Sequence, residues 1–209
     1  MKNEKKMHWK KVYLEKSADQ VSWTQDYPTG SMEMIKSFNL DKSAPIIDIG
    51  GGDSLLVDFL LQEGYSDITV VDISARALEK AKTRLGERSA KIKWIEGDIR
   101  DFVPQRNYAL WHDRATFHFL RSSEEIFSNV QMAGQFTSKY LVMATFSLTG
   151  PEKCSGLLVS RYSKNTLCEL FKDGFKNIEC RAQQHITPMQ RSQDFLFCCF
   201  KKINFNQIQ

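Results

Sequence analysis

Short apolar runs alternate with helix-like stretches over the first two thirds of the chain, and this alternation restricts the fold more than any other feature. The runs are rich in β-branched and aromatic residues and predict strands at 44–49, 68–73, 91–96, 107–111 and 139–146. Helix-like stretches lie between them at 55–63, 75–85 and 124–136. Such alternation is typical of βαβ units around a parallel sheet. The strands IIDI and TVVDI are nearly continuous apolar runs, which indicates burial on both faces.

The two ends of the chain predict different structure. Residues 163–171 are helix-like, and strands are expected at 176–182 and 194–201 with no helix between them. This predicts an antiparallel pair joined by a long loop. Before the first strand, the amphipathic segments 9–16 and 31–38 are expected to lie outside the sheet and to cap one face. A chain of 209 residues is therefore expected to form one α/β domain, 40–209, preceded by a helical cap, 1–39.

Charge and hydropathy argue against two classes of partner. The 29 Lys and Arg residues exceed the 25 Asp and Glu residues by four, which is too small an excess to indicate nucleic-acid binding. No apolar run approaches the ~20 residues of a membrane span. The basic N-terminus has no apolar stretch behind it and so is not typical of a secretory signal. We expect neither a nucleic acid nor a membrane as partner, and expect the N-terminal lysines to lie on a solvated helix face. They are Lys2, Lys5, Lys6, Lys10 and Lys11.

The cysteines indicate a reducing compartment. They are Cys154, Cys168, Cys180, Cys198 and Cys199. No two of them form a C-x-x-C pair, so the spacing of a metal site is absent. An odd number of scattered cysteines predicts reduced thiols and a cytoplasmic location.

A run of three glycines links the first expected strand to the first helix after it, in the segment I-I-D-I-G-G-G-D-S, residues 46–54. Glycines let the backbone approach a ligand closely, and a helix N-terminus favours negative groups. In a doubly wound sheet, a ligand binds at the carboxyl ends of the strands. A tight turn with no ligand is the alternative, but three consecutive glycines are entropically costly.

Two classes of ligand use this strand–turn–helix geometry. A dinucleotide requires G-x-G-x-x-G, and Leu55 occupies the position of the third glycine. Asp48 and Asp53 would also lie beside the pyrophosphate, where two carboxylates repel a dianion. S-adenosylmethionine (SAM) instead carries a sulfonium and an ammonium group at this end. The loop chemistry therefore favours SAM over NAD.

Two later acids fit the same ligand. Asp72 ends the second expected strand and is placed to accept both ribose hydroxyls, as an acid at this position does in dinucleotide folds. Asp98 follows the third strand and is placed to accept from the adenine amino group, with Ile99 against the ring. Either acid alone has a helix N-cap or turn role as its alternative. The combination of the glycine loop with Asp72 and Asp98 at successive strand ends favours the ligand.

These segments resemble a known family. D-I-G-G-G-D-S, V-V-D-I-S and E-G-D-I are similar to the cofactor motifs of class I SAM-dependent methyltransferases, over residues 40–205. The resemblance implies a three-layer Rossmann-like fold whose seven-stranded sheet is mostly parallel with one antiparallel strand. Ser54 departs from the usual D-x-G-x-G-x-G. The residues expected to bind SAM are Asp48, Gly50, Gly51, Gly52, Asp72, Ile73, Asp98, Ile99 and His112.

The segment after the fourth strand, H-D-R-A-T-F-H-F-L, is expected at the acceptor side. It resembles the D-R/K-G-x-x segments of enzymes that methylate small thiols or lysines of translation factors. A base is needed only if the nucleophile arrives protonated, and Asp113, His112 and His118 are the candidates. The alternatives are an Asp113–Arg114 ion pair that shapes the loop and a core position for His118.

Aromatic residues of the expected cap, Trp9, Tyr13, Trp23 and Tyr27, either line an acceptor pocket or hold the cap to the sheet. The expected pocket residues are Trp23, Tyr27, Arg114, Phe117, Cys154 and Tyr162, with Arg161 and His185 as unranked candidates. The leading hypothesis is methyl transfer from SAM to a small-molecule thiol, amine or carboxylate. The alternatives are a protein lysine N-methyltransferase and a SAM-binding module without turnover. The acceptor and the oligomeric state stay open.

Overall fold

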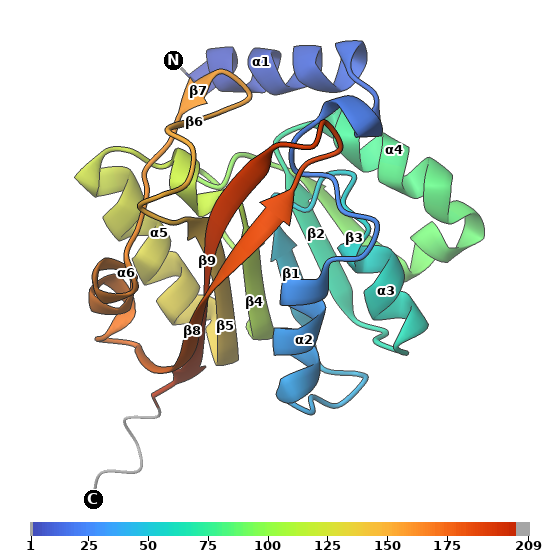
Figure 1. The fold of residues 1–209 in the computed structure, drawn as a ribbon. Coiled ribbons are helices and arrows are strands. Elements are labelled where there is room, and N and C mark those ends of the chain that lie inside the picture. Colours follow the sequence, from blue (N-terminus) through green and yellow to red (C-terminus); the bar gives the residue numbers. More distant parts are fainter. Residues whose placement is uncertain (1, 204–209) are drawn as a thin grey trace, which may run out of the picture.

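The computed structural model describes residues 2–203, and its centre is a seven-stranded sheet covered by helices on both faces (Figure 1). The strands are β1 (Ile46–Ile49), β2 (Ile68–Asp72), β3 (Ile92–Glu96), β4 (Tyr108–Arg114), β5 (Thr137–Phe146), β8 (Phe175–Ile186) and β9 (Ser192–Lys202). The helices are α1 (Lys2–Glu15), α2 (Thr29–Ser37), α3 (Leu56–Gln62), α4 (Ala75–Leu85), α5 (Ser123–Phe136) and α6 (Lys164–Phe171). A small hairpin, β6 (Lys153–Cys154) with β7 (Leu157–Leu158), stands apart from the sheet.

The sheet has the strand order β3-β2-β1-β4-β5-β9-β8. β1 pairs in parallel with β2 on one side and β4 on the other, while β9 runs antiparallel to both β5 and β8. This confirms the predicted fold class, a mostly parallel sheet with one antiparallel strand. The chain order reverses between β1 and β4, and ligands of such sheets bind at the carboxyl ends of the strands at that point.

Serine caps begin three of the predicted helices. The hydroxyl oxygens of Ser74, Ser122 and Ser163 accept from backbone N–H groups of the first turns of α4, α5 and α6. Each bond satisfies a donor that has no partner within the helix, and such a cap contributes about 1 kcal/mol. The helices of the sheet therefore begin within a residue or two of the predicted positions.

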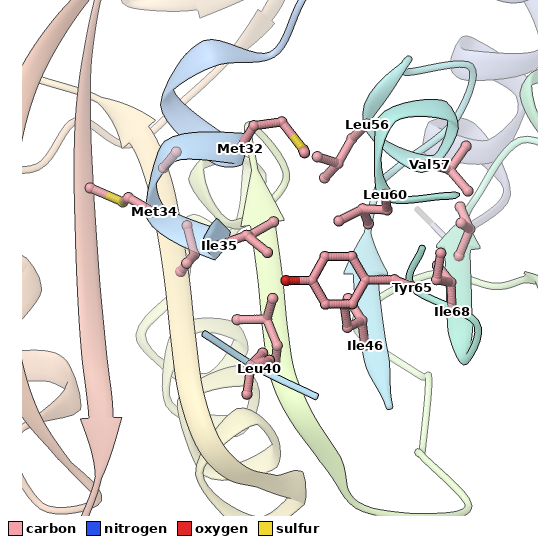
Figure 2. Packing of buried hydrophobic residues seen from close by; sticks show 14 of the residues in the cluster. Met32, Met34, Ile35, Leu40, Ile46, Leu56, Val57, Leu60, Tyr65 and Ile68 are labelled. Carbon is pink, nitrogen blue, oxygen red and sulfur yellow. The ribbon is translucent and has the colours of Figure 1, made fainter. Parts of the chain in front are cut away.

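The helix α2 packs into the main core rather than forming a separate cap. Met32 and Ile35 are fully buried against Leu56 and Leu60 of α3, over the strands β1 and β2 (Figure 2). The opposite face carries a second core, in which Phe171 of α6 contributes to the packing. The predicted boundary after residue 39 therefore does not coincide with a break in the hydrophobic core.

The helix α1 has a different position from α2. It crosses the edge at which the parallel strands end (Figure 1) and contacts α4. Trp9 packs on Phe119, and Lys5 donates a hydrogen bond to the Phe119 carbonyl at 3.2 Å. Lys6 pairs with Glu96 at the end of β3, at 2.6 Å. The two predicted cap segments thus cover two different surfaces of the sheet.

None of the helices within residues 2–203 is long and apolar enough to cross a membrane.

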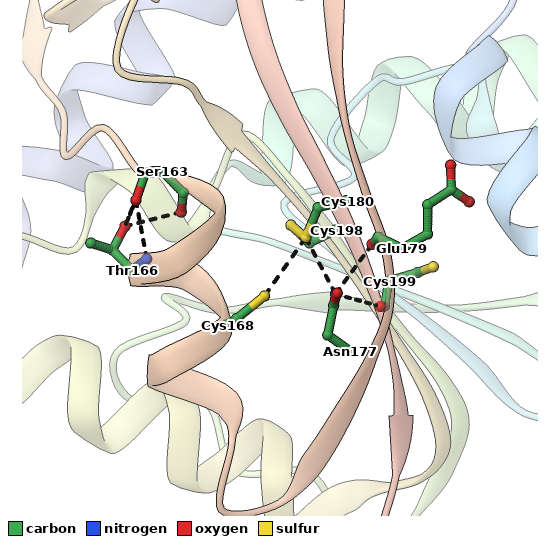
Figure 3. Close-up of a disulfide and its surroundings, with 8 residues drawn as sticks. All are labelled: Ser163, Thr166, Cys168, Asn177, Glu179, Cys180, Cys198 and Cys199. Atoms are coloured by element: carbon green, nitrogen blue, oxygen red, sulfur yellow. Dashed lines mark hydrogen bonds between the residues drawn. A yellow bond between two sulfur atoms is a disulfide. The ribbon is translucent and has the colours of Figure 1, made fainter.

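The C-terminal hairpin corrects two predictions. The strands β8 and β9 extend further than expected, so the turn between them, residues 187–191, is short rather than long. Cys180 and Cys198 lie opposite each other in the antiparallel register and form a disulfide (Figure 3). The prediction of five reduced thiols is therefore wrong for this pair. The Sγ atom of Cys168, on α6, lies 3.8 Å from that of Cys180. Sequence spacing could not reveal this cluster, because its members come from three elements.

Candidate functional site

A cavity of about 340 Å³ opens at the carboxyl edge of the sheet, where the chain order reverses. Its floor is built by the ends of β1, β2 and β4 and by the loop after β3. Its roof is built by α1 and the segment that follows it. Residues of the floor are Asp48, Ile49, Gly50, Gly51, Val71, Asp72, Ile73, Asp98, Ile99, His112 and Arg114. The topology thus brings the strand-end motifs to one place.

The glycine turn requires glycine for conformation and for space. Gly50 and Gly52 have positive φ angles of 68° and 48°. A Cβ atom on Gly50 would collide with the Thr116 side chain in the loop after β4, and one on Gly52 would lie 2.8 Å from the Tyr13 hydroxyl. Gly50 and Gly51 line the cavity, whereas Gly52 is buried behind it. The turn therefore brings backbone close to any ligand in the cavity.

Asp72 presents a buried carboxyl group to the cavity. It is 7% exposed, and its Oδ1 accepts from the Ser74 backbone N–H at 2.7 Å. The pKa of Asp72 is raised to about 7, mainly by burial and also by the nearby carboxyl groups of Asp53 and Asp48, while backbone hydrogen bonds oppose the rise. Burial also raises the pKa of Asp53. This end of the cavity therefore favours a ligand that brings hydroxyl donors or positive charge.

Asp98 is held more tightly than the sequence suggested. Its Oδ1 accepts from the Arg100 backbone N–H at 3.0 Å and from the Arg100 Nε at 2.9 Å. Burial opposes ionisation of Asp98, but the hydrogen bonds and charge of Arg100 outweigh it and lower its pKa. Asp98 and Ile99 both line the cavity. A ligand there meets a carboxylate that already has one cationic partner.

A row of three buried side chains joins β1, β4 and α2. His112 Nδ1 lies 2.7 Å from Asp48 Oδ1, and His112 Nε2 lies 2.8 Å from Ser31 Oγ. All three residues line the cavity, and none is more than 3% exposed. With Asp48 ionised, Nδ1 donates to the carboxylate and Nε2 accepts from the serine hydroxyl. Sequence reasoning missed Ser31, because nothing in the motif around α2 distinguishes it from other serines.

Asp113 is a loop-forming residue in this structure. Its Oδ1 accepts from the backbone N–H groups of Thr116 and Phe117, both at 3.0 Å. Asp113 is fully buried and lies outside the cavity lining, and burial raises its pKa to about 7. Its carboxyl group therefore holds the loop that carries Arg114 and Thr116, rather than facing the cavity itself.

Arg114 follows Asp113 and lines the cavity. Its Nη1 donates to the Trp23 carbonyl at 3.1 Å, and its guanidinium lies 4.8 Å from the centre of the Phe195 ring. Burial lowers the pKa of Arg114 to about 10, so it stays cationic at neutral pH. The sequence left open an ion pair between Asp113 and Arg114 that would shape the loop. Among residues 2–203 the two side chains form no such pair.

Besides Gly52 and Asp113, four residues expected at the site lie outside the cavity lining. His118 is fully buried outside the cavity lining, beside Phe119 and Phe146, and burial lowers its pKa to about 3. This environment keeps His118 neutral and away from any acceptor, so the geometry gives its predicted base role no support. The others are Phe117 and Tyr162, which pack together in the second core, and Tyr27, which packs on Phe59. None of the three lines the cavity.

A cluster of aromatic side chains forms the roof of the cavity. Trp9 lies edge-on to Trp23 and to Phe119, with ring centres 5.6 and 5.3 Å apart, and Tyr13 lies 5.8 Å from Trp23. Cys154 also lines the cavity, and burial raises the pKa of its thiol to about 11. Trp23 and Cys154 therefore both line the cavity. The unranked candidates Arg161 and His185 are bound to Glu152 and to the Ser22 carbonyl.

Residues 46–133 match a protein family described as a methyltransferase domain. They contain the glycine turn, Asp72, Asp98 and the loop after β4. This region is a methyltransferase domain. Among solved structures, a SAM-dependent methyltransferase from Anabaena variabilis superposes with a TM-score of 0.73 at 15% identity, covering 96% of this chain and 94% of that one. The N-methyltransferase NodS of Bradyrhizobium japonicum, in complex with S-adenosylhomocysteine, gives 0.66 at 15% identity over 86% and 90%.

Two curated methyltransferases are also similar to this chain in sequence. The EEF1A lysine methyltransferase 2 of Danio rerio is 25% identical over 142 residues, which are 66% of this chain and 57% of that protein. A malonyl-[acyl-carrier protein] O-methyltransferase of Anoxybacillus flavithermus is 37% identical over 82 residues, 38% of this chain and 30% of that protein. The chain thus spans about half, or less, of these relatives.

NodS and a 1,6-didemethyltoxoflavin-N1-methyltransferase of Burkholderia thailandensis, both neighbours in this fold, are crystallised with S-adenosylhomocysteine, and the chemistry of the cavity suits a molecule of that kind. The buried carboxyl group of Asp72 offers oxygen atoms to hydroxyl donors, and the acids around it favour positive charge. The turn at Gly50 leaves room for close approach of a ligand. The donors and acceptors of the floor therefore suit a nucleoside with a cationic side arm.

Proposed function

We propose that this protein transfers a methyl group from SAM to a small-molecule nucleophile. The observation that carries the proposal is one cavity in which the glycine turn and Asp72 face an acceptor side of polar and aromatic side chains. About 340 Å³ is room of the order expected for small-molecule sites. When bound, SAM supplies an activated methyl group, and the residues of the chain orient the partners.

On the cofactor side, Asp72 accepts hydrogen bonds from the ribose hydroxyls. Gly50 and Gly51 let the backbone approach the methionine part, and Gly52 keeps the turn compact behind them. Asp98, Ile73 and Ile99 surround the adenine, with the Asp98 carboxylate shared between the adenine and Arg100. Charge-assisted bonds such as those to Asp72 are about twice as strong as neutral ones.

On the acceptor side, the row of Ser31, His112 and Asp48 moves a proton. His112 Nε2 takes the proton of the acceptor through the Ser31 hydroxyl, while Asp48 holds the ring through Nδ1 and stabilises the imidazolium. Asp113 is a positioning residue, because it fixes the loop through two backbone N–H groups. Fixing two reactants in line supplies much of the rate of a displacement.

Isothermal titration with SAM and S-adenosylhomocysteine tests the cofactor half of the proposal. We expect saturable binding of both, and no binding by either at millimolar concentration would contradict it. Single-turnover methylation with labelled SAM and a metabolite extract tests the acceptor half. Label in small metabolites supports the proposal. Binding of SAM without transfer to any acceptor would instead support a SAM-binding module without turnover.

A protein lysine N-methyltransferase is the second candidate. It is favoured by the likeness to the lysine methyltransferase of Danio rerio over 66% of this chain, and by aromatic side chains around the cavity that suit a cation. Incubation of labelled SAM with a lysate discriminates between the two. Label in a protein band supports the lysine candidate, and label confined to metabolites supports the small-molecule acceptor.

A cytoplasmic location stays a prediction.

A further inference from the structure

We propose that the methyl acceptor carries a carboxylate group, separate from the atom that is methylated, and that this carboxylate pairs with Arg114. The inference rests on the proposed function and names the chemical class of its substrate. It follows from the unused hydrogen-bonding edge of the Arg114 guanidinium and from what surrounds it in the cavity wall.

One edge of the guanidinium has no partner. Nη1 donates to the Trp23 carbonyl, whereas Nε and Nη2 are shielded from water and donate to no acceptor among the described residues. Nε–H and one N–H of Nη2 point in the same direction along one side of the planar group. Two parallel donors with this spacing match the two oxygens of a carboxylate. The free edge of Arg114 therefore has the donor geometry that a carboxylate binds in bidentate fashion.

No acid within residues 2–203 forms an ion pair with Arg114. Asp48, the acid that interacts with it over a longer range, is already engaged by His112. The other close groups are the Phe195 ring, the Cys154 thiol with its raised pKa, and His118, whose lowered pKa keeps it neutral. A buried cation without an anion is unfavourable, and an anionic ligand removes this penalty.

The rest of the acceptor side selects among anions. Trp9, Trp23 and Phe119 form apolar walls near Arg114, which suit an apolar or aromatic body rather than a highly charged one. A single arginine with one free edge matches a monoanion with two coplanar oxygens. A lysine ammonium group would instead be repelled by Arg114. The preferred acceptor is therefore an organic acid with an apolar body.

The test uses 3-phenylpropanoate, with 3-phenylpropanamide as its neutral isostere, titrated into the protein with and without saturating S-adenosylhomocysteine. We expect the acid to bind about tenfold or more tightly than the amide, as a charge-assisted bidentate pair predicts. Arg114→Met is expected to abolish the preference, and Arg114→Lys to keep part of it because the charge remains. Circular dichroism and a melting curve check that both variants fold.

Arg161→Met is the matched control. Arg161 lies outside the cavity lining and binds Glu152 and the Gly150 carbonyl, so its loss is expected to leave the acid preference unchanged. Equal affinity of the unaltered protein for acid and amide would overturn the proposal. A preference that survives in Arg114→Met would overturn it as well.

The carboxylate of SAM itself is the competing occupant of Arg114. Comparing S-adenosylhomocysteine with 5′-methylthioadenosine, which lacks that carboxylate, separates the two. If Arg114→Met weakens binding of the first but not of the second, Arg114 holds the cofactor and the proposal fails. If the unaltered protein binds neither nucleoside, the proposed function fails, while the titration without nucleoside still measures the acid preference.

Discussion

At the scale of single residues, strand register decides which polar groups meet. Asp48 and His112 are direct neighbours across the β1–β4 pair, so their side chains project to the same face. The same register places Asp113 opposite Ile49, on the other face, where it binds backbone groups instead. Adjacent residues in the H-D-R segment therefore have different tasks. Sequence reasoning had offered both as catalytic candidates.

The Asp72 carboxyl group predicts a pH-dependent affinity. Because burial raises its pKa to about 7, it is partly protonated at neutral pH, and a protonated carboxyl accepts hydroxyl donors poorly. Binding of S-adenosylhomocysteine is expected to strengthen as the pH rises from 6 to 8. Asp72→Asn is expected to lose roughly 1–3 kcal/mol of binding and the pH dependence with it. Calorimetry across this range measures both, and an unchanged profile in Asp72→Asn would show that another group titrates.

The same raised pKa has the opposite sign for folding. Between pH 4 and 7 the native state of the free protein binds a proton at Asp72 more tightly than the unfolded chain does, so its contribution to stability falls as the pH rises through this window. Asp72→Asn removes the ionisable group. We expect the free energy of unfolding to fall from pH 5 to pH 7 in both proteins, and to fall less in Asp72→Asn than in the parent. Urea unfolding of the free proteins at the two pH values measures this difference.

His118 predicts acid sensitivity. Burial lowers its pKa to about 3, below the unfolded value of 6.5, so its contribution to stability is complete above pH 6.5 and is lost as the pH falls toward 3. At pH 5 the loss amounts to about 2 kcal/mol. His118→Gln cannot charge and is expected to flatten this part of the unfolding profile. A profile of the same slope in the variant would assign the acid sensitivity to other groups.

At the scale of elements, the turn between β1 and α3 is held against the loop after β4. Thr116 Oγ1 donates to the Ile49 carbonyl at 3.3 Å, and its side chain fills the space beside Gly50. The proposed cofactor end and the proposed acceptor end of the cavity therefore share one contact. A side chain on Gly50 would disturb both at once.

Gly50→Ala is expected to weaken S-adenosylhomocysteine binding by tenfold or more, because it combines a positive φ with a collision against Thr116. Gly134→Ala is the matched control. Gly134 lies inside α5, a Cβ there would meet nothing within 4 Å, and alanine favours the helix by about 1 kcal/mol. We expect the control to bind normally and to melt no lower than the parent. Weakened binding in the control alone would contradict the interpretation.

At the scale of the whole molecule, the cavity exists because distant segments close over one edge of the sheet. The N-terminal helix α1 supplies Trp9 and Tyr13, the loop after it supplies Trp23, and α2 supplies Ser31. The floor comes from the methyltransferase domain at residues 46–133. Part of the cavity lining therefore comes from segments that lie outside the region that matches the family.

The Ser31–His112–Asp48 row gives a prediction at this scale, because it joins three elements. His112→Asn is expected to lower single-turnover methylation by about 10²-fold or more, and Ser31→Ala by a smaller factor, with S-adenosylhomocysteine affinity nearly unchanged. Thr145→Val, a buried polar substitution away from the cavity, is the control. A proportional loss of affinity would place His112 in the cofactor site instead.

The sequence by itself determined the layers of the fold and the edge of the sheet at which the strand-end motifs meet. Apolar runs, serine caps and the glycine turn are local features, and a parallel sheet brings successive strand ends to one edge. The predicted strands and helices, with Asp48, Gly50, Asp72 and Asp98 at that edge, follow from these rules. Local chemistry was enough, because each motif lies within a few residues of the strand that positions it.

Only the tertiary structure decided which side chains meet at the proposed acceptor end. The pairing of His112 with Ser31 spans 81 positions and the contact of Arg114 with the Trp23 carbonyl spans 91, so no spacing rule could indicate them. The same holds for the disulfide between Cys180 and Cys198, and for the burial that keeps His118 neutral away from the cavity. Such features depend on which surfaces pack together, and packing is a property of the assembled molecule.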